Sequence, residues 1–438
     1  MNTRRYFLQS AAAAPLAAAA QITKSSPEKI RIATIGIGGM GTGDTQYALR
    51  LPNVELVAVA DIYSGRLERV KERWGSQVFT TRDYREVLAR KDVDAVIVAT
   101  PDHWHSRISI AAMEAGKDVY CEKPMVHRIG EGMQMVETQK RTGRILQIGS
   151  QYVSSKVFER ARDLLNEGAI GELNMVEAWL DRNTALGAWQ YSLPTDATPQ
   201  TVDWDRFLGH APKRPFEPVR LFRWRNYDDY GTGVAGDLFV HLLSGLHLVT
   251  GSIGPVRVYA SGGVRFWKDG RDAADVMLAL MDYPKTAAHP EFTFALRVNL
   301  ASGTPAEKFG FRFVGSGGQM VTTMNGINLT RTPRETAPGY TIGTYSKKVQ
   351  DEFLAAYKEK FPKGGEIKDA KEEFIPPPPG HEAHLDHHMN FHAAVRSRKP
   401  FVEDGVYGFR AAGPALLANL SLAEGRAIQW NPEKMVIA

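Results

Sequence analysis

The fold is decided by two stretches, KIRIATIGIGGMG from Lys29 to Gly41 and VELVAVAD from Val54 to Asp61. Both contain apolar runs rich in β-branched residues, which are typical of strands buried on both faces. Gly36, Gly38 and Gly41 form a G-x-G-x-x-G turn between the first run and a segment of helical length. We therefore predict a strand, a tight turn, a helix and a parallel strand, the first unit of a doubly wound sheet.

This unit has the residues that a bound dinucleotide requires. Gly36 permits the tight turn, Gly38 lets the backbone approach a pyrophosphate, and Gly41 lets the helix pack closely on the strand. The pyrophosphate would lie at the helix N-terminus, where free N–H groups favour an anion. Asp61 would accept hydrogen bonds from the adenosine ribose and repel a 2′-phosphate, which predicts NAD in preference to NADP. Arg66 lies nearby in the sequence and would soften that preference.

The N-terminus has the pattern of an export signal. The segment TRRYFLQ from Thr3 to Gln9 resembles a twin-arginine signal, and an alanine-rich run to Ala20 follows it. The run is too short and too weakly apolar to span a membrane. We therefore expect residues 1–20 to be a cleaved signal, read by the twin-arginine export machinery, and the mature protein to be periplasmic or otherwise beyond the cytoplasmic membrane. The alternative is a disordered cytosolic tail.

Composition excludes several other classes of protein. The chain has 438 residues, room for two domains, and a formal net charge of +5 without a basic block, so nucleic-acid binding gains no support. The single cysteine, Cys121, excludes an internal disulfide and a cysteine zinc cluster. Cys121 lies in an apolar strand, which favours packing over a nucleophilic role. After removal of the signal we expect no membrane association.

Residues 28–150 alternate between strand and helix patterns, which predicts a Rossmann domain with a doubly wound parallel sheet. Further strands are expected at 94–100, 118–121 and 144–148, and helices at 67–74, 108–115 and 126–142. A turn and a short helix are expected within 79–89. Two motifs follow strands, TPDHWH at 100–105 and EKP at 122–124. Ligands of such sheets bind at the carboxyl ends of the strands.

Residues 151–438 are predicted to form a second, α+β domain, whose successive strands make a large, mainly antiparallel open sheet. Helices are expected at 156–167, 238–249 and 403–424, and strands at 171–181, 256–264, 275–283, 292–300 and 308–316. The loop-rich segment 183–218 is expected to fold over a cleft. An insertion at 326–380 contains apolar residues spaced by four, from Val349 to Phe361, which predict a helix.

A Rossmann unit followed by TPDHWH and EKP resembles the glucose–fructose oxidoreductase, inositol dehydrogenase and rhizopine-catabolism (Gfo/Idh/MocA) family. The resemblance covers most of the mature chain and is weak in the insertion. It implies that Lys123 lies near the nicotinamide and the reacting hydroxyl. It also implies that Asp237 and His241, a D-x-x-x-H pair on one helix, act with Lys123. The alternative is that Asp237 caps the helix and His241 packs in the core.

The resemblance and the glycine motif together predict a set of ligand-binding residues. Those expected to bind the cofactor are Gly36, Gly38, Gly39, Met40, Gly41, Asp61, Thr100, Pro101, His103, His105, Glu122 and Lys123. Those expected to bind substrate are Trp104, Arg223, Arg225, Tyr227 and Tyr230. For Arg223 and Arg225, the alternative to binding substrate is ion pairing with Asp228 and Asp229. For His103 and His105, lining of the cofactor pocket is favoured over a metal site.

A histidine-rich tract runs from His381 to His392, and three of its members lie four residues apart. Metal binding is disfavoured, because the tract runs into a segment that resembles the family's ordinary closing helix, so no metal is expected.

The predicted function is oxidation of a CH–OH group of a sugar, cyclitol or sugar derivative by a nicotinamide cofactor. One alternative is a redox-neutral glycoside hydrolase of the same superfamily, in which a tightly bound NAD oxidises the sugar, the glycosidic group is eliminated, and the hydride returns. Another is a non-catalytic sugar-binding protein. The family implies a homodimer or homotetramer formed through the outer face of the second sheet.

Overall fold

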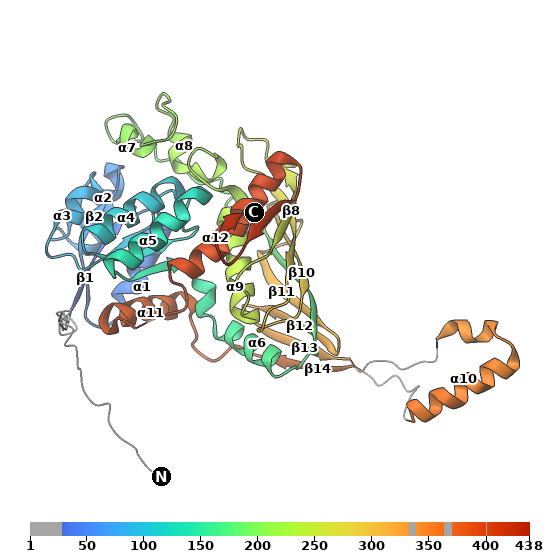
Figure 1. Cartoon of the computed structure of the whole chain (residues 1–438). Helices are drawn as coiled ribbons and strands as arrows, with labels where there is room; N and C mark the ends of the chain where they lie inside the picture. The colour runs from blue at the N-terminus through green and yellow to red at the C-terminus, as the bar shows by residue number, and fades with distance from the viewer. Residues whose placement is uncertain (1–28, 333–338, 363–369, 400) are drawn as a thin grey trace, which may run out of the picture.

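The computed structural model describes residues 29–332, 339–362, 370–399 and 401–438, so the predicted export signal lies outside the described residues. Figure 1 shows two layered units side by side, the Rossmann domain and a second domain built on a large sheet. In the described part of the chain, no helix is both long enough and apolar enough to cross a membrane.

The first sheet has six parallel strands in the order β3-β2-β1-β4-β5-β6, which confirms the doubly wound prediction. Its strands are β1 (Ile30–Ile35), β2 (Val54–Ala60), β3 (Phe79–Thr81), β4 (Ala95–Val98), β5 (Asp118–Glu122) and β6 (Leu146–Gly149). The order reverses between β1 and β4, and ligands bind at this point of such sheets. Strand β3 corrects our prediction of a turn in this segment. It has only three residues, too few to show the alternation typical of a strand, and it pairs with β2 at the edge of the sheet.

Five helices accompany this sheet, namely α1 (Gly39–Leu49), α2 (Ser64–Trp74), α3 (Tyr84–Ala89), α4 (His105–Glu114) and α5 (Gly132–Thr142). The expected helix start at residue 126 is wrong, because α5 begins only at Gly132. The preceding backbone N–H groups of His127 and Arg128 donate to the Glu131 side chain. Cys121 is buried in β5, where burial raises the pKa of its thiol to about 12, as expected for a packing residue.

The second sheet has ten strands in the order β14-β13-β12-β11-β7-β10-β9-β8-β15-β16. They are β7 (Leu173–Asp181), β8 (Arg257–Gly263), β9 (Val276–Tyr283), β10 (Phe292–Asn299), β11 (Lys308–Gly315), β12 (Gly318–Thr323), β13 (Gly326–Arg331), β14 (Lys371–Ile375), β15 (Ile428–Asn431) and β16 (Val436–Ile437). Only the β7–β10 pairing is parallel among the described strands of this sheet, so it is mainly antiparallel, as predicted.

One face of this sheet is covered and the other is open. Helices α6 (Lys156–Asn166), α9 (Val240–Thr250) and α12 (Gly405–Glu424) lie between the sheet and the Rossmann domain (Figure 1). Tyr259, Leu278 and Leu280 remain about half exposed on strands β8 and β9. An antiparallel sheet of this kind must meet solvent or a partner with its open face.

The loop-rich segment and the insertion both contain helices, and only the helix of the insertion was predicted. The loop-rich segment contains two short helices, α7 (Trp204–Leu208) and α8 (Pro218–Phe222), which lie across the end of the Rossmann domain (Figure 1). The insertion contains the expected helix, α10 (Lys347–Lys360), and Figure 1 shows it standing away from the sheet beyond β13 and β14. No residue of α10 is buried.

The histidine-rich tract forms helix α11 (Ala383–Ser397), which packs against α1 of the Rossmann domain. His388 stacks on Tyr120 with ring centroids 4.5 Å apart, and its Nε2 lies 3.3 Å from Asp44. His387 Nε2 donates to the Ile148 carbonyl at 2.8 Å. The described residues contain no group of three side chains that could hold a metal ion. The tract therefore docks helix α11 on the first domain.

We predict that this docking weakens at low pH. Burial lowers the pKa of His387 to about 3, whereas an unfolded histidine titrates near 6.5. Below about pH 6.5 the unfolded chain binds a proton here that the folded chain does not, so stability falls as the pH falls, by ~2 kcal/mol at pH 5. His387→Gln should show a smaller decrease than the wild type in unfolding free energy between pH 7.5 and 5, measured with urea. Equal decreases in the two proteins would contradict this prediction.

Candidate active site

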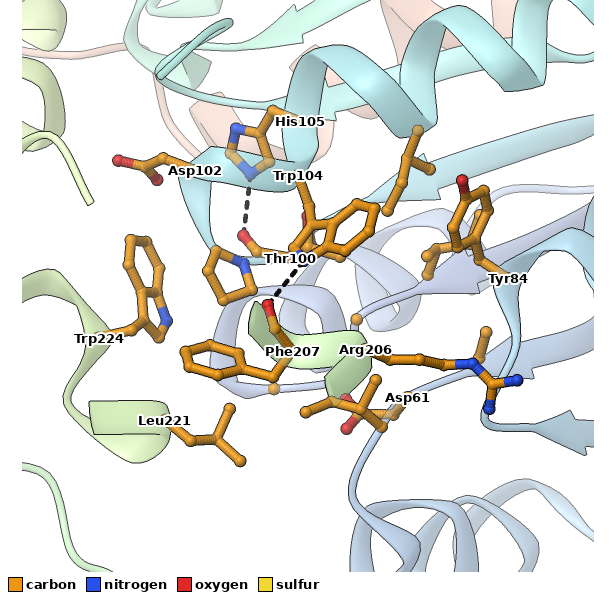
Figure 2. Close-up of a pocket in the computed structure, with 18 of the residues that line it drawn as sticks. Asp61, Tyr84, Thr100, Asp102, Trp104, His105, Arg206, Phe207, Leu221 and Trp224 are labelled. Carbon is orange, nitrogen blue, oxygen red and sulfur yellow. Dashed lines mark hydrogen bonds between the residues drawn. The ribbon is translucent and has the colours of Figure 1, made fainter. Parts of the chain in front are cut away.

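A cavity of about 660 Å³ lies at the carboxyl ends of the Rossmann strands and is closed by the second domain (Figure 2). We call its cover, residues 191–225, the strap. Most of the residues predicted to bind the cofactor line this cavity, namely Gly36, Gly38, Gly39, Met40, Asp61, Thr100, Pro101, His105, Glu122 and Lys123. The glycine turn and the EKP motif thus face one space.

The glycine turn is fixed by close packing. Gly36 has a φ of +86°, and a Cβ on it would lie 2.7 Å from the Ala99 carbonyl oxygen. A Cβ on Gly41 would lie 2.0 Å from the Gly36 carbonyl oxygen. Gly41 therefore allows the helix to approach the strand, but it lies beneath the turn and does not line the cavity. This corrects its placement among the residues that contact the cofactor.

Asp61 connects the end of β2 to the glycine turn. Its Oδ2 accepts from the Ile37 N–H at 2.9 Å and its Oδ1 from the Tyr63 N–H at 3.0 Å. Arg66 Nη1 lies 3.4 Å from the same carboxylate, and the Arg66 guanidinium packs over the ring of Phe222 on the strap. The negative charge of Asp61 is thus partly offset at the edge of the cavity.

The strap is bonded to the Rossmann domain along its length. Val202 forms a β-bridge with Tyr63, and the Asp203 N–H donates to the Ile62 carbonyl at 2.9 Å. Tyr63 Oη donates to Asp196 at 2.5 Å. The Trp104 indole N–H donates to the Phe207 carbonyl at 2.9 Å, a bond drawn in Figure 2. The expectation that this segment folds over a cleft is confirmed.

The two histidines of TPDHWH have different positions. His105 bridges two loops, with Nδ1 2.7 Å from the Pro124 carbonyl oxygen and Nε2 2.9 Å from that of Thr100. It thereby fixes the EKP turn relative to the preceding strand end. His103 is buried behind the cavity wall, where its Nε2 donates to the Phe207 carbonyl at 2.8 Å and burial lowers its pKa to about 3. The prediction that His103 lines the pocket is therefore wrong.

Lys123 and Asp237 meet across the domain boundary. Lys123 Nζ donates to Asp237 Oδ1 at 2.7 Å and to the Asp237 carbonyl oxygen at 2.8 Å. Arg225 Nε donates to the same Oδ1 at 3.0 Å. Burial would raise the pKa of Asp237, but the charges of Lys123 and Arg225 outweigh it and hold this pKa well below its usual range. Asp237 is therefore an anion shared by two cations.

The helix before α9 departs from the expected geometry. Residues Ala235–Phe239 form a π-helical turn, so Asp237 lies inside a wider turn and its side chain caps no helix. The capping alternative is wrong, because the carboxylate is occupied by Lys123 and Arg225. The i, i+4 relation to His241 is also not that of a regular α-helix.

His241 lies one turn along, and it is 8 % exposed. Burial, reinforced by the charge of Lys123, lowers the pKa of His241 well below its usual value, so the imidazole is neutral. Its ring centroid lies 4.9 Å from that of Tyr152. Neither His241 nor Asp237 is among the residues that line the cavity, whereas Lys123 and Arg225 are. The structure therefore brings the three predicted catalytic residues together but exposes only Lys123 to the cavity.

Three of the predicted substrate residues do not line the cavity: Arg223 is bonded within the strap, and Tyr227 and Tyr230 pack against it, which corrects their assignment. Arg223 Nε donates to the Tyr191 carbonyl at 2.8 Å. Tyr227 stacks under Arg220, and Tyr230 is fully buried with its ring 4.6 Å from that of Phe207. Of the predicted set, Trp104 and Arg225 line the cavity.

The alternative pairing of Arg223 and Arg225 with the two adjacent acids is also wrong. Asp229 pairs with Arg214 at 2.8 Å and lies 3.8 Å from Arg220. Arg225 pairs with Asp237 instead.

Sequence reasoning missed several residues of the cavity. Trp224, Arg206 and Phe207 come from the strap, and Tyr84 from the segment after β3 (Figure 2). Asp102 lay inside the quoted TPDHWH motif but was not selected. The strap residues were missed because they reach the cavity only through long-range contacts, which no local sequence pattern indicates.

Asp102 connects the two domains at the same point. Its Oδ2 accepts from the Thr232 N–H at 3.0 Å and from the Thr232 hydroxyl at 2.6 Å. Burial, aided by the negative charge of Asp237, raises the pKa of Asp102 to about 7. The residue lines the cavity and is nearly inaccessible to solvent.

Comparison with known proteins gives its most direct evidence on the family of the first domain. Residues 30–150 match the oxidoreductase family with an NAD-binding Rossmann fold, Gfo/Idh/MocA. Inositol 2-dehydrogenase of Salmonella typhimurium is 31 % identical over 146 residues, which are 32 % of this chain and 44 % of that protein. Glycosyl hydrolase family 109 protein 1 of Shewanella sp. (strain MR-4) is 31 % identical over 159 residues, which are 34 % of this chain and 35 % of that protein. The matches thus span less than half the length of these curated relatives.

Solved structures share the fold of nearly the whole chain. Levoglucosan dehydrogenase, in complex with NADH and levoglucosan, superposes with a TM-score of 0.66 at 16 % identity, covering 92 % of this chain and 99 % of that one. At this identity the likeness shows the fold alone. The comparisons therefore support the Gfo/Idh/MocA family for the Rossmann domain and establish the two-domain fold for most of the chain.

Proposed function

We propose that this protein is a nicotinamide-dependent oxidoreductase that acts on a CH–OH group of a sugar, cyclitol or sugar derivative. The observation that carries the proposal is the Lys123–Asp237–Arg225 cluster, whose two cations line the same cavity as the glycine turn. Ionisable groups whose pKa values are strongly perturbed by burial and by a charged partner cluster at functional sites. The match of residues 30–150 to the oxidoreductase family supports the same conclusion.

The cofactor, when bound, would accept a hydride from the carbinol carbon. The chain's own residues would do the rest. Lys123 would donate a hydrogen bond to the reacting hydroxyl and stabilise the negative charge that develops on its oxygen. Asp237 would hold the Lys123 ammonium in place. His241, a neutral imidazole one turn away, would accept the proton, and this role requires a path to the cavity from behind Lys123.

A second candidate is the redox-neutral glycoside hydrolase, in which the nucleotide stays bound between oxidation and reduction. The bonds between the strap and the Rossmann domain favour it, as does the resemblance to a glycosyl hydrolase family 109 protein. Net NADH formation would support the dehydrogenase, and aglycone release without net NADH the glycosidase. A non-catalytic sugar-binding protein is disfavoured, because the paired Lys123 and Asp237 serve no simple binding role.

Location and assembly are further parts of the proposal. The twin-arginine pattern supports export to the periplasm, and cell fractionation would test it. The exposed apolar side chains on β8 and β9 support a homodimer or homotetramer formed through the open sheet face. Sedimentation equilibrium would test the oligomer.

We predict that Lys123 and Asp237 act as one unit. Lys123→Ala should lower turnover by at least about a hundredfold while NAD binding is retained. Asp237→Asn should give a loss of similar size, because it frees the ammonium that Asp237 orients. Since residues that act as a unit are non-additive, the double variant should be little worse than the poorer single one. Steady-state kinetics on the true substrate would measure this.

The matched control for the lysine is Lys213→Ala, which removes a largely exposed lysine of the strap. It should leave turnover unchanged. If the losses of Lys123→Ala and Asp237→Asn multiplied in the double variant, the two residues would act independently and the proposal for the cluster would fail.

We predict that NAD binds about tenfold more tightly than NADP, because Asp61 repels a phosphate on the adenosine ribose. Arg66 partly offsets that charge, so Arg66→Ala should increase the preference for NAD. Fluorescence titrations with both reduced nucleotides would give the two dissociation constants. Tighter binding of NADP to the wild type would show that this interpretation of Asp61 is wrong.

We predict that the strap slows the release of the nucleotide. Tyr63→Phe removes only the hydroxyl that bonds to Asp196 outside the cavity. Loss of one such hydrogen bond should raise the NADH dissociation rate roughly three- to tenfold. Stopped-flow displacement of bound NADH would measure the rate. Tyr259→Phe, on the open face of the second sheet, is the control, and equal rates for the two variants would exclude the strap as the barrier.

A further inference from the structure

The side chain of Arg225 has a position that its contacts with the protein do not fully explain. It follows Trp224 in a short 3₁₀ turn, and its guanidinium lies over the Trp224 indole, 4.2 Å from the ring centroid. Its Nε donates to Asp237. Among the residues that the structure describes, no acceptor is found for either Nη atom of Arg225. Both Arg225 and Trp224 line the cavity, so these donors are available to a ligand.

The charges around Arg225 do not balance. Asp237 Oδ1 accepts from both Lys123 and Arg225, so one carboxylate serves two cations. Two further acids of the cavity lie near these cations. Burial raises the pKa of Glu122 well above its usual value, which keeps that carboxyl neutral. Asp102 accepts from Thr232 with Oδ2, and its Oδ1 has no hydrogen-bond partner among the described residues. Burial raises the pKa of Asp102 to about 7, so it carries only part of a charge at neutral pH. A buried, uncompensated positive charge is costly, and an anionic ligand would relieve that cost.

The shape of the donor selects the kind of anion. A guanidinium presents a planar fork of N–H groups that matches a carboxylate, and its bonds to an ionised acceptor are about twice as strong as neutral ones. A carboxylate also carries the single charge that the cluster lacks, whereas a phosphate monoester would exceed it. The chemistry of the site therefore favours a monoanion.

The spacing of the two cations fits one sugar ring. Lys123 Nζ and Arg225 Nε bind the same oxygen, at 2.7 and 3.0 Å, so they lie less than two hydrogen-bond lengths apart. A hydroxyl on Lys123 and a carboxylate on Arg225 can thus belong to one pyranose or one open-chain sugar acid.

We propose that Arg225 is the specificity-determining residue of this site and that the substrate is an acidic sugar, whose carboxylate binds the Arg225 fork while its hydroxyl binds Lys123. The inference rests on the proposed function and narrows it to uronic or aldonic acids. The reaction remains a balanced transfer: the carbinol carbon loses a hydride to NAD and its hydroxyl loses a proton, which leaves a carbonyl group.

The test compares acids with their neutral counterparts on the protein loaded with NAD. The probes are D-glucuronate, D-galacturonate and D-gluconate, with D-glucose, D-galactose and glucose 6-phosphate as comparisons. Two readouts are taken, binding by quenching of tryptophan fluorescence and reduction of the bound NAD by absorbance. We expect at least one acid to bind at least tenfold more tightly than every neutral sugar. Preference for a neutral sugar or for the sugar phosphate would overturn the inference.

Variants connect the preference to Arg225. Arg225→Gln removes the guanidinium fork and its bond to Asp237, and it should lower the affinity for the acid at least tenfold more than the affinity for neutral sugars, because only the acid loses a charged bond to the protein. Arg225→Lys should restore part of the affinity, which also guards against a folding defect in the first variant. The control is Arg214→Gln, whose guanidinium pairs with Asp229 outside the cavity and which should behave as the wild type. An Arg225→Gln variant that keeps the acid preference would refute the assignment.

The two readouts separate this inference from the proposed function. Tight binding of an acid that depends on Arg225, without reduction of NAD, would uphold the inference and refute the oxidoreductase. Reduction of NAD by neutral sugars, without any preference for acids, would uphold the oxidoreductase and refute the inference about Arg225.

Discussion

The site depends on one buried carboxylate that two cations share. Asp237 belongs to the second domain and Lys123 to the Rossmann domain, so the pair exists only when the domains are closed on each other. Removing one partner of a buried ion pair leaves an uncompensated charge and typically costs ~3–5 kcal/mol. The same contact therefore positions the reactive lysine and penalises any opening between the domains. His105 supports it from behind, because its ring lies between the Thr100 carbonyl just after the end of β4 and the Pro124 carbonyl of the EKP turn.

The strap extends this coupling to the other end of the cavity. Many of its contacts with the Rossmann domain use main-chain atoms of the strap: the Asp203 N–H donates to Ile62, and carbonyl groups of the strap accept from Ser64, Arg82 and Trp104. On the strap side, such bonds depend little on side-chain identity, so the cover can be kept while the strap residues that face the ligand vary. A nucleotide under this cover would leave only when several bonds break together. That property suits a cofactor held through turnover better than one exchanged after each hydride transfer.

The sequence allowed the architecture to be predicted, because both sheets depend on local patterns: buried β-branched runs for the parallel strands and successive strands without helices for the second sheet. Strand β3 was not predicted, because a strand of three residues is too short to show the alternating pattern of buried and exposed residues. The positions of the glycine turn and Lys123 at the cavity, and of Asp237 beside Lys123, were predictable from motifs with fixed spacing, whereas their roles stay predictions. Arg223, Tyr227 and Tyr230 were misassigned, because an aromatic or basic residue near a motif has the same pattern whether it faces a ligand or packs a strap. Only the long-range contacts, such as Tyr230 against Phe207, distinguish the two cases.

The cluster around Asp237 also indicates where stability is exchanged for function. Replacing buried ion pairs with apolar residues of similar size is often neutral or stabilising, so the fold alone does not require Lys123, Arg225 and Asp237. Asp102 adds a second carboxylate whose pKa is raised to about 7, which a purely structural tether to Thr232 would not need, since an asparagine could accept the same bonds. The site contains two cations, Lys123 and Arg225, and one carboxylate, Asp237, that stays ionised. Asp102 titrates near neutral pH, so the net charge of the site can change when a ligand binds. An anionic substrate would favour the protonated form of Asp102, so that the substrate, and not Asp102, balances the second cation.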